Sequence, residues 1–217
     1  METPTTATTL RRPRRDSQRK SIAILKAATK LFLKDGFSAT SMDAVAFAAN
    51  VSKRTVYGHY GNKEGLYAAV VQRLTSEILP QSATEPGKGP AKDDVEARFV
   101  RIGVAFLSSI YTVEQIRLFW LLVSESREHP AIGRMMYEGP IKSSRAVLRA
   151  FLDDCVRLHV LDIEHTERAA IQYLAMLKMD TQMRLLLNCR GTPTAEEIRA
   201  TAEACARQFL YGAVRRG

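Results

Sequence analysis

Apolar side chains recur every three or four residues along most of the chain, which is the spacing expected of helices. No segment alternates apolar and polar residues in the way that a half-buried strand does. Asp16 or Ser17 can cap the first helix, and Gly36 lies where a residue of positive φ would end it. Residues 81–94 have the composition of a loop. The sequence therefore predicts an all-α protein with helices at about 17–34, 41–49, 53–60, 63–79, 95–111, 113–127, 131–159, 164–189 and 194–214.

The turn and cap signals between residues 40 and 60 predict a helix-turn-helix. A short helix is expected to open at Thr40 or Ser41, where a hydroxyl can accept from a free backbone N–H group. Asn50 can adopt the positive φ of a tight turn, and Ser52 can cap the helix that follows. Helix, turn, hydroxyl cap and second short helix in succession define this motif.

The second helix of the motif has one apolar face, and the rest of its surface is polar. Val56 and Tyr60 are four residues apart and are predicted to point into the core. Lys and Arg can donate to guanine, Thr and Tyr can reach bases, and His and Lys suit phosphate. Free N–H groups at the start of the next helix can also bind a phosphate. The candidate DNA contacts are Thr40, Ser41, Ser52, Lys53, Arg54, Thr55, Tyr57, Gly58, His59 and Lys63.

Positive charge is concentrated at the N-terminal end of the chain. Residues 1–63 hold twelve Lys and Arg against four Asp and Glu, so they carry eight of the nine net positive charges. Such an asymmetry indicates a polyanionic partner. Residues 1–15 are expected to be disordered in isolation. The basic arm within them either contacts DNA or is a solvated tail, and its cations are Arg11, Arg12, Arg14 and Arg15.

A resemblance to the TetR/AcrR family of bacterial transcription regulators rests on the stretch VSKRTVYGHYGNKEGL and on the upstream ILKAATKLFLKDGFSATSMDAVAFAANVSK. The resemblance covers about Ser17 to Leu66. It implies a repressor, usually a homodimer, whose third helix enters the major groove and whose C-terminal helical domain binds a small inducer. The chain departs from the family pattern at Asn50, Gly58 and Tyr60, and none of these departures breaks the resemblance.

The C-terminal region is similar to the AefR-like domain of some of these regulators, over FLSSIYTVEQIRLFWLLVSESREHPAIGRMMYEGPIKSSRAVLRAFL. The resemblance places the homodimer interface on the last two helices, where Leu177, Leu186 and Phe209 are candidates for the seam. An apolar or aromatic inducer is expected, because large adaptable side chains gather where the family binds its inducer. They are Phe119, Trp120, Met135, Met136, Tyr137, Tyr173 and Met176, and ordinary helical core is the alternative interpretation of each.

The expected organisation is a basic arm at 1–15, a DNA-binding domain at 16–63 and a ligand-binding and dimerisation domain at 64–217. Neither a phosphate-binding loop nor a hydrolase or zinc-protease motif is present, so we expect no enzyme, no cofactor and no metal. An enzyme and a basic architectural or RNA-binding protein stay open as alternatives. The three widely spaced Cys and the short apolar runs predict a cytoplasmic protein without a membrane partner.

Overall fold

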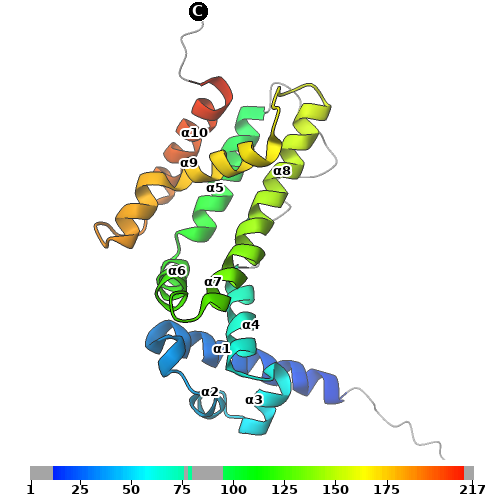
Figure 1. Ribbon diagram of the computed structural model, residues 1–217, viewed down its shortest axis with the longest axis vertical. Helices are drawn as coiled ribbons and strands as arrows, with labels where there is room; N and C mark the ends of the chain where they lie inside the picture. Colours follow the sequence, from blue (N-terminus) through cyan, green and yellow to red (C-terminus); the bar gives the residue numbers. More distant parts are fainter. Residues whose placement is uncertain (1–11, 76–77, 80–94, 213–217) are drawn as a thin grey trace, which may run out of the picture. The chain divides into compact units, whose positions relative to one another are not determined.

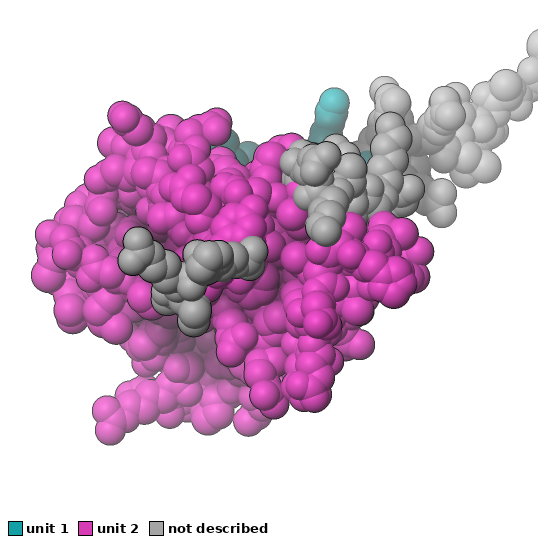
Figure 2. All heavy atoms as spheres, turned by 90° about the horizontal axis from the view of Figure 1, so that it is seen from above, with its two compact units in different colours: residues 1–71 teal, residues 72–217 magenta. Residues whose placement is uncertain are grey.

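The computed structural model describes residues 12–75, 78–79 and 95–212 of the 217-residue chain. The described residues form helices and no strand, which confirms the predicted fold class (Figure 1). The chain divides into two compact units, Met1–Val71 and Gln72–Gly217, which Figure 2 distinguishes by colour. The boundary falls inside a helix, eight residues beyond the predicted one. The predicted loop at 81–94 lies outside the described residues.

The first unit contains α1 (Arg12–Ala39), α2 (Met42–Ala48), α3 (Lys53–Tyr60) and the first part of α4 (Lys63–Thr75). At Gly36 the backbone of α1 leaves the helical region with a φ of 84°, as the sequence predicted. The predicted start at residue 16 or 17 is wrong, because α1 already begins at Arg12. Two features support the longer helix. Pro13 is at the second helical position, where no backbone N–H is needed, and Asp16 pairs with Lys20 one turn later at 2.7 Å.

An aromatic cluster forms the centre of this first unit. The ring of Tyr67 on α4 lies edge-on to those of Phe32 and Phe37 on α1, with centroid distances of 4.9 Å to each. Val45 of α2 and Val56 of α3 are fully buried in the same unit. α3 therefore buries one residue against the core that α1 and α4 supply, whereas α2 also buries Met42 and Ala46.

The second unit contains α5 (Val95–Ile110), α6 (Val113–Glu125), α7 (Pro130–Met136), a π-helical turn η3 (Tyr137–Ile141), α8 (Lys142–Arg157), α9 (Thr166–Leu186) and α10 (Ala195–Tyr211). Its core surrounds Phe99 of α5. Phe151 of α8, Tyr173 of α9 and Phe209 of α10 place their rings 5.0 to 5.6 Å from that of Phe99. The Tyr173 hydroxyl also donates to the Phe99 carbonyl at 2.7 Å. α5 thus supplies the centre of this aromatic core and packs mainly against α10 (Figure 1).

Two helices of the second unit are interrupted where the sequence predicted continuity. The predicted helix 131–159 is wrong in this respect, because Pro140 lacks an N–H donor and the chain passes through η3 between α7 and α8. α9 is broken at Met179, whose φ of 5° and ψ of −110° are not helical. Among the described residues no single helix is long and apolar enough to cross a membrane, and α5 with α6 meet that criterion only as a pair bent by 69°.

Candidate nucleic-acid interface and internal cavity

The two helices of the predicted helix-turn-helix are capped as the sequence predicted. The Ser41 hydroxyl accepts from the Ala44 N–H at 3.1 Å, and the Ser52 hydroxyl accepts from the Thr55 N–H at the same distance. Asn50 has a φ of 52°, so it makes the tight turn between α2 and α3. These contacts fix where each helix begins and therefore which side chains α3 exposes.

Thr40 does not lie on the exposed surface. Its side chain is buried, and its hydroxyl donates to the Gly36 carbonyl at 2.8 Å. This bond satisfies a carbonyl that the interruption of α1 at Gly36 leaves without its helical partner. The prediction that Thr40 offers its side chain to DNA is therefore corrected: the hydroxyl stabilises the end of α1.

α3 is anchored on one side and open on the other. Val56 is fully buried, and the Tyr60 hydroxyl lies 2.8 Å from the Ser21 hydroxyl of α1. The inward orientation predicted for both residues is confirmed. Thr55 is half-buried, and its hydroxyl lies 2.8 Å from that of Ser52. The exposed predicted contacts on this helix are Lys53, Arg54, Tyr57, Gly58 and His59.

Lys53 is paired with Asp43, a residue that the sequence analysis did not select. Its ammonium lies 2.8 and 3.0 Å from the two carboxylate oxygens of Asp43 on α2 and 6.0 Å from the centre of the Tyr57 ring. The hydrogen bond and the charge of Asp43 raise the pKa of Lys53. An acidic residue in the first turn of α2 was the available signal, but its distance from Lys53 depends on how the turn folds.

Lys63 begins α4, and its ammonium is directed to the end of α1. It donates to the Ser38 carbonyl at 3.0 Å and lies 4.5 Å from the centre of the Phe37 ring. Close by, the Asn62 side chain accepts from the Gly65 N–H at 2.7 Å and caps α4. A Cβ atom at Gly65 would lie only 2.3 Å from the Tyr60 carbonyl oxygen. Gly65 therefore allows α4 to start directly against the end of α3.

The basic arm is only partly described. The backbone of Arg12, Arg14 and Arg15 belongs to α1, whereas Arg11 lies outside the described residues. The part of the arm from Arg12 onward is therefore helical and not disordered as predicted.

A cavity of about 160 Å³ that opens partly to solvent lies in the second unit, lined by residues of α5, α6, α8, α9 and the segments beside them. Of the seven predicted ligand contacts, Phe119 and Met136 line it. Trp120 and Tyr137 do not, because nearly half of each side chain is exposed to solvent. Met135 and Met176 lie outside the lining, and Tyr173 is fully buried in the core around Phe99. Two of the seven predicted residues thus line this cavity, and their contact with a ligand stays a prediction.

The polar groups of the cavity were not predicted. The Tyr111 hydroxyl donates to the Lys178 carbonyl at 3.0 Å, next to the break of α9, and burial raises the pKa of Tyr111 to about 12. Gln115 donates to the Leu74 carbonyl in the last turn of α4. Arg145 donates to the Tyr137 hydroxyl at 3.1 Å and lies over its ring. Their positions depend on helix packing, which residue spacing does not encode.

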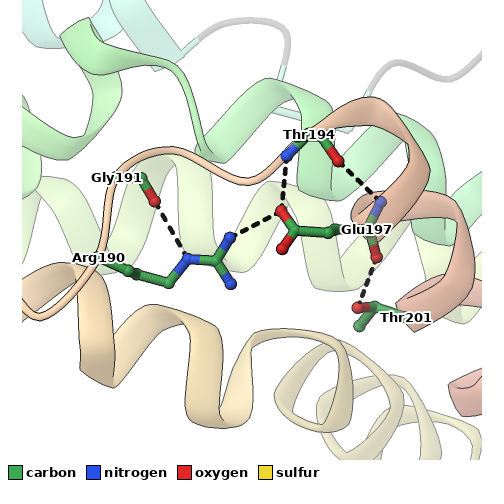
Figure 3. Close-up of polar contacts among 5 residues, drawn as sticks. All are labelled: Arg190, Gly191, Thr194, Glu197 and Thr201. Atoms are coloured by element: carbon green, nitrogen blue, oxygen red, sulfur yellow. Dashed lines mark hydrogen bonds and ion pairs between the residues drawn. The ribbon is translucent and has the colours of Figure 1, made fainter.

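The start of α10 is fixed by a compact polar network (Figure 3). The Glu197 carboxylate accepts from the Thr194 N–H at 2.8 Å and from Arg190 at 2.7 Å, and the Glu197 N–H donates to the Thr194 hydroxyl. The backbone hydrogen bond from Thr194 and the Arg190 side chain lower the pKa of Glu197. This capping box orders the connection between α9 and α10.

Of the three residues predicted for the dimer seam, Leu177 is buried, and Leu186 and Phe209 are half-buried. Leu177 is buried in the core, Leu186 lines the cavity, and Phe209 packs on Phe99 and Tyr173. Most of the contacts of these three side chains are thus made within their own unit, and their place in a dimer seam stays a prediction. A different set of apolar side chains, in α9 and at the residue that follows it, is exposed with a spacing of four residues: Met179, Met183 and Leu187.

Two family models match the two parts of the chain. One, described as bacterial regulatory proteins of the tetR family, matches residues 24–70. The other, described as the C-terminal domain of AefR-like transcriptional repressors, matches residues 97–212.

Curated relatives match mainly through the N-terminal region. The HTH-type transcriptional regulator YhgD of Bacillus subtilis is 47% identical over 65 residues, which cover 29% of this chain and 34% of that protein. The HTH-type transcriptional regulator AcrR of Shigella flexneri is 26% identical over 165 residues, or 74% of this chain and 76% of that protein. The chain covers less than half of the length of the first three curated relatives.

Solved structures match over both units. A TetR-family regulator from Mesorhizobium loti MAFF303099 has a TM-score of 0.79 and 24% identity, over 89% of this chain and 96% of that one. The regulator FrrA, named flavonoid-responsive, has a TM-score of 0.71 and 28% identity over the same shares. Because the C-terminal family model alone matches more than half of the 217 residues and the tetR model matches the helix-turn-helix, the chain belongs to the TetR family of bacterial transcription regulators and carries an AefR-like C-terminal domain.

Proposed function

We propose that the chain is a cytoplasmic repressor that binds a pseudo-palindromic DNA operator as a homodimer and is released by a small molecule. The observation that carries the DNA-binding part is the exposed polar face of α3, which Val56 and the Tyr60 bond to Ser21 hold from behind. Two such helices related by a two-fold axis would enter major grooves about one helical turn, on the order of 34 Å, apart. In this proposal residues 16–63 bind DNA, and residues 64–217 bind the ligand and dimerise.

Each exposed residue of α3 has a distinct proposed role. Arg54 and Lys53 donate to base edges, and Tyr57 contacts bases or thymine methyl groups. His59 contacts phosphate, and so do the free N–H groups at the starts of α2 and α3, beside Ser41 and Ser52. Lys63 reaches phosphate only by leaving the Ser38 carbonyl, so its main role is to tie α4 to α1.

Selection of bound duplexes from genomic fragments tests this function, followed by affinity measurements on the selected site. Arg54→Ala should weaken specific binding by about 1 to 3 kcal/mol and relax the preference at one base pair. Arg168→Ala removes the same charge from an exposed position of α9 in the second unit and is the matched control. No enriched sequence, or an equal loss in both variants, would argue for a non-specific basic protein instead.

The homodimer is proposed to form through α9 and α10, with the exposed stripe of Met179, Met183 and Leu187 in the seam. Three large apolar side chains on one helix face are suited to a two-fold contact. Met183→Glu should shift the protein to monomers in sedimentation velocity and lower operator affinity. Gln172→Glu adds the same charge to an exposed position on the first half of α9 and should leave the dimer intact. A dimeric Met183→Glu variant would place the seam elsewhere.

Release is proposed to begin in the internal cavity. FrrA, at 28% identity, is named as responsive to a small molecule, which supports a similar response here. Gln115 lines the cavity and donates to the Leu74 carbonyl of α4, the helix whose first turn follows the DNA-binding motif. A ligand that displaces Gln115 would therefore favour a different position of α4. A coupling of about 1 to 3 kcal/mol would weaken DNA binding roughly 5- to 150-fold.

Gln115→Leu tests this route, because it removes the bond to α4 and keeps a side chain of similar size. The variant should still bind the effector. The effector should lower its operator affinity by a smaller factor than it lowers that of the native protein. If release is unchanged while the effector still binds, the coupling passes through another contact.

A further inference from the structure

The internal cavity carries positive charge without any acidic residue to balance it. Most of its lining is apolar, contributed by residues such as Phe106, Leu118 and Leu174. The charged lining residues are Arg145 of α8 and Lys178 of α9, and no Asp or Glu belongs to the lining that the structure describes. Both side chains are half-buried beside this apolar surface, which is unusual because charged side chains partly withdrawn from water are normally paired.

In the part of the chain that the structure describes, the Lys178 ammonium forms no hydrogen bond or ion pair. Its backbone carbonyl accepts from the Tyr111 hydroxyl. Burial and the nearby charge of Arg145 lower the pKa of Lys178. Both effects disfavour the charged form of Lys178, and a bound anion would offset this penalty.

Arg145 is only partly engaged. One guanidinium nitrogen donates to the Tyr137 hydroxyl, and the group lies 5.2 Å from the centre of the Tyr137 ring. A guanidinium has five N–H donors in a planar fork, and among the described residues no carboxylate pairs with this one. Tyr137 therefore orients Arg145, while donors suited to a carboxylate stay available.

We propose that the cavity binds a small organic monoanion, with its carboxylate between Arg145 and Lys178 and its apolar body among the aliphatic and aromatic walls. This proposal rests on the proposed role of the second unit as the ligand-binding part of the regulator. The volume of about 160 Å³ sets the size of the body. A cavity of about 150 Å³ holds one benzene molecule, so one ring or a short alkyl chain fits without rearrangement.

The same features argue against other classes of ligand. A cationic ligand would meet two like charges inside an apolar space. Inorganic phosphate would satisfy the cations but leave the apolar walls facing a hydrated ion. A neutral apolar ligand, which the sequence suggested, would fill the space and leave the charge of Lys178 uncompensated.

Binding by the full-length protein to probes matched in shape tests the proposal. The first set is benzoate, benzamide and benzylamine, and the second is hexanoate and hexanamide, each titrated by isothermal calorimetry. In at least one set, the carboxylate should bind about tenfold or more tightly than its amide, because hydrogen bonds to charged groups are the stronger ones. Benzylamine should show no binding. Equal affinity of carboxylate and amide in both sets, or no binding of either carboxylate at millimolar concentration, would overturn the proposal.

Charge-removing variants assign the preference to this site. Lys178→Met and Arg145→Met should each reduce the ratio of carboxylate to amide affinity several-fold, and Lys178→Met should raise the thermal midpoint without ligand because it removes an unpaired charge. Arg168→Met loses the same charge at an exposed position of α9 and should keep the native ratio. If Lys178→Met does not fold, Lys178→Gln serves for the same ratio. If the Lys178 variant keeps the native ratio of carboxylate to amide affinity, the assignment of the anion site to Lys178 is overturned.

Operator binding is measured separately on the same preparations. Binding of the carboxylate without release of DNA would contradict the proposed role as inducer but not the anion site. Release of DNA by amide and carboxylate alike would contradict the anion site but not the regulator. The two proposals therefore fail in different experiments.

Discussion

Gly65 and Gly58 provide a sharp test of how the DNA-binding motif is packed, because the same substitution should have opposite effects at the two positions. Gly65 lies in the first turn of α4, where an added Cβ would be 2.3 Å from the Tyr60 carbonyl oxygen. Gly58 lies in the middle of α3, where an added Cβ would have no atom within 4 Å. Both positions are helical, so the intrinsic preference of a helix for Ala over Gly applies to both.

The magnitudes follow from these two distances. Gly58→Ala should stabilise α3 by about 1 kcal/mol, since only the helix propensity changes. At Gly65 the backbone of Tyr60 must retreat by roughly 0.7 Å to reach the shortest contact that real Cβ atoms show. Overpacking of this kind costs about 1 to 3 kcal/mol. Because the clash is with backbone, the cost lies at the upper end of this range. After the gain in helix propensity is subtracted, Gly65→Ala should lower the free energy of unfolding by about 2 kcal/mol.

Hydrogen exchange of α3 and α4 amides in the free protein measures both effects locally. Protection in α3 should rise about fivefold in Gly58→Ala and fall about thirtyfold in Gly65→Ala. Gly65→Ser adds a Cβ atom at the same place, so it should lower the protection of α3 amides as Gly65→Ala does. Equal protection in the two alanine variants would show that α4 does not start against the Tyr60 carbonyl.

Three further predictions concern single contacts. Tyr60→Phe should destabilise the first unit by about 1 kcal/mol in urea denaturation, because it removes the hydrogen bond to Ser21; an unchanged midpoint would contradict the anchoring of α3. Glu197→Gln should lower the thermal midpoint at neutral pH. Because the folded-state pKa of Glu197 is depressed, its stabilising effect is present above the unfolded pKa and disappears as the pH falls through the lower folded pKa. Below that pH, variant and native protein should melt at the same temperature. A difference in thermal midpoint that stays constant at all pH values would show that the charge of the carboxylate is not the cause. Cys189 is exposed, whereas burial raises the pKa of Cys155 to about 11, so iodoacetamide at pH 8 should modify Cys189 first and Cys155 only after unfolding, as peptide mass mapping would show.

Local signals in the sequence predicted the DNA-binding motif well, because caps and turns are determined within four residues. Ser41, Asn50 and Ser52 behave as their chemistry indicates, and the burial of Val56 follows from helical spacing. The exception is Thr40. A hydroxyl beside a helix start can either cap that helix or satisfy the preceding one, and the sequence does not distinguish the two.

The second unit was less predictable because its helices have neighbours on several sides. Periodicity shows that an apolar face exists but not which neighbour covers it, so Leu177 was assigned to the dimer and Tyr173 to the ligand although both are buried in the core. The cavity follows from gaps between packed helices. Lys178 could not be selected from sequence, because a lysine on a helix is normally solvated. Only its position in the fold makes it unusual.

The break of α9 at Met179 divides this helix into two segments that contact different parts of the unit. The segment before the break is fixed by Tyr173 and Leu177 in the core, and the segment after it exposes Met183 while Leu185 reaches the cavity. Because the dihedral angles of Met179 are not helical, we expect the second segment to turn about this residue while the first stays packed. A molecule of one ring that presses on Leu185 could thus reorient an outward-facing stripe by rotating a few backbone dihedrals, without melting any helix.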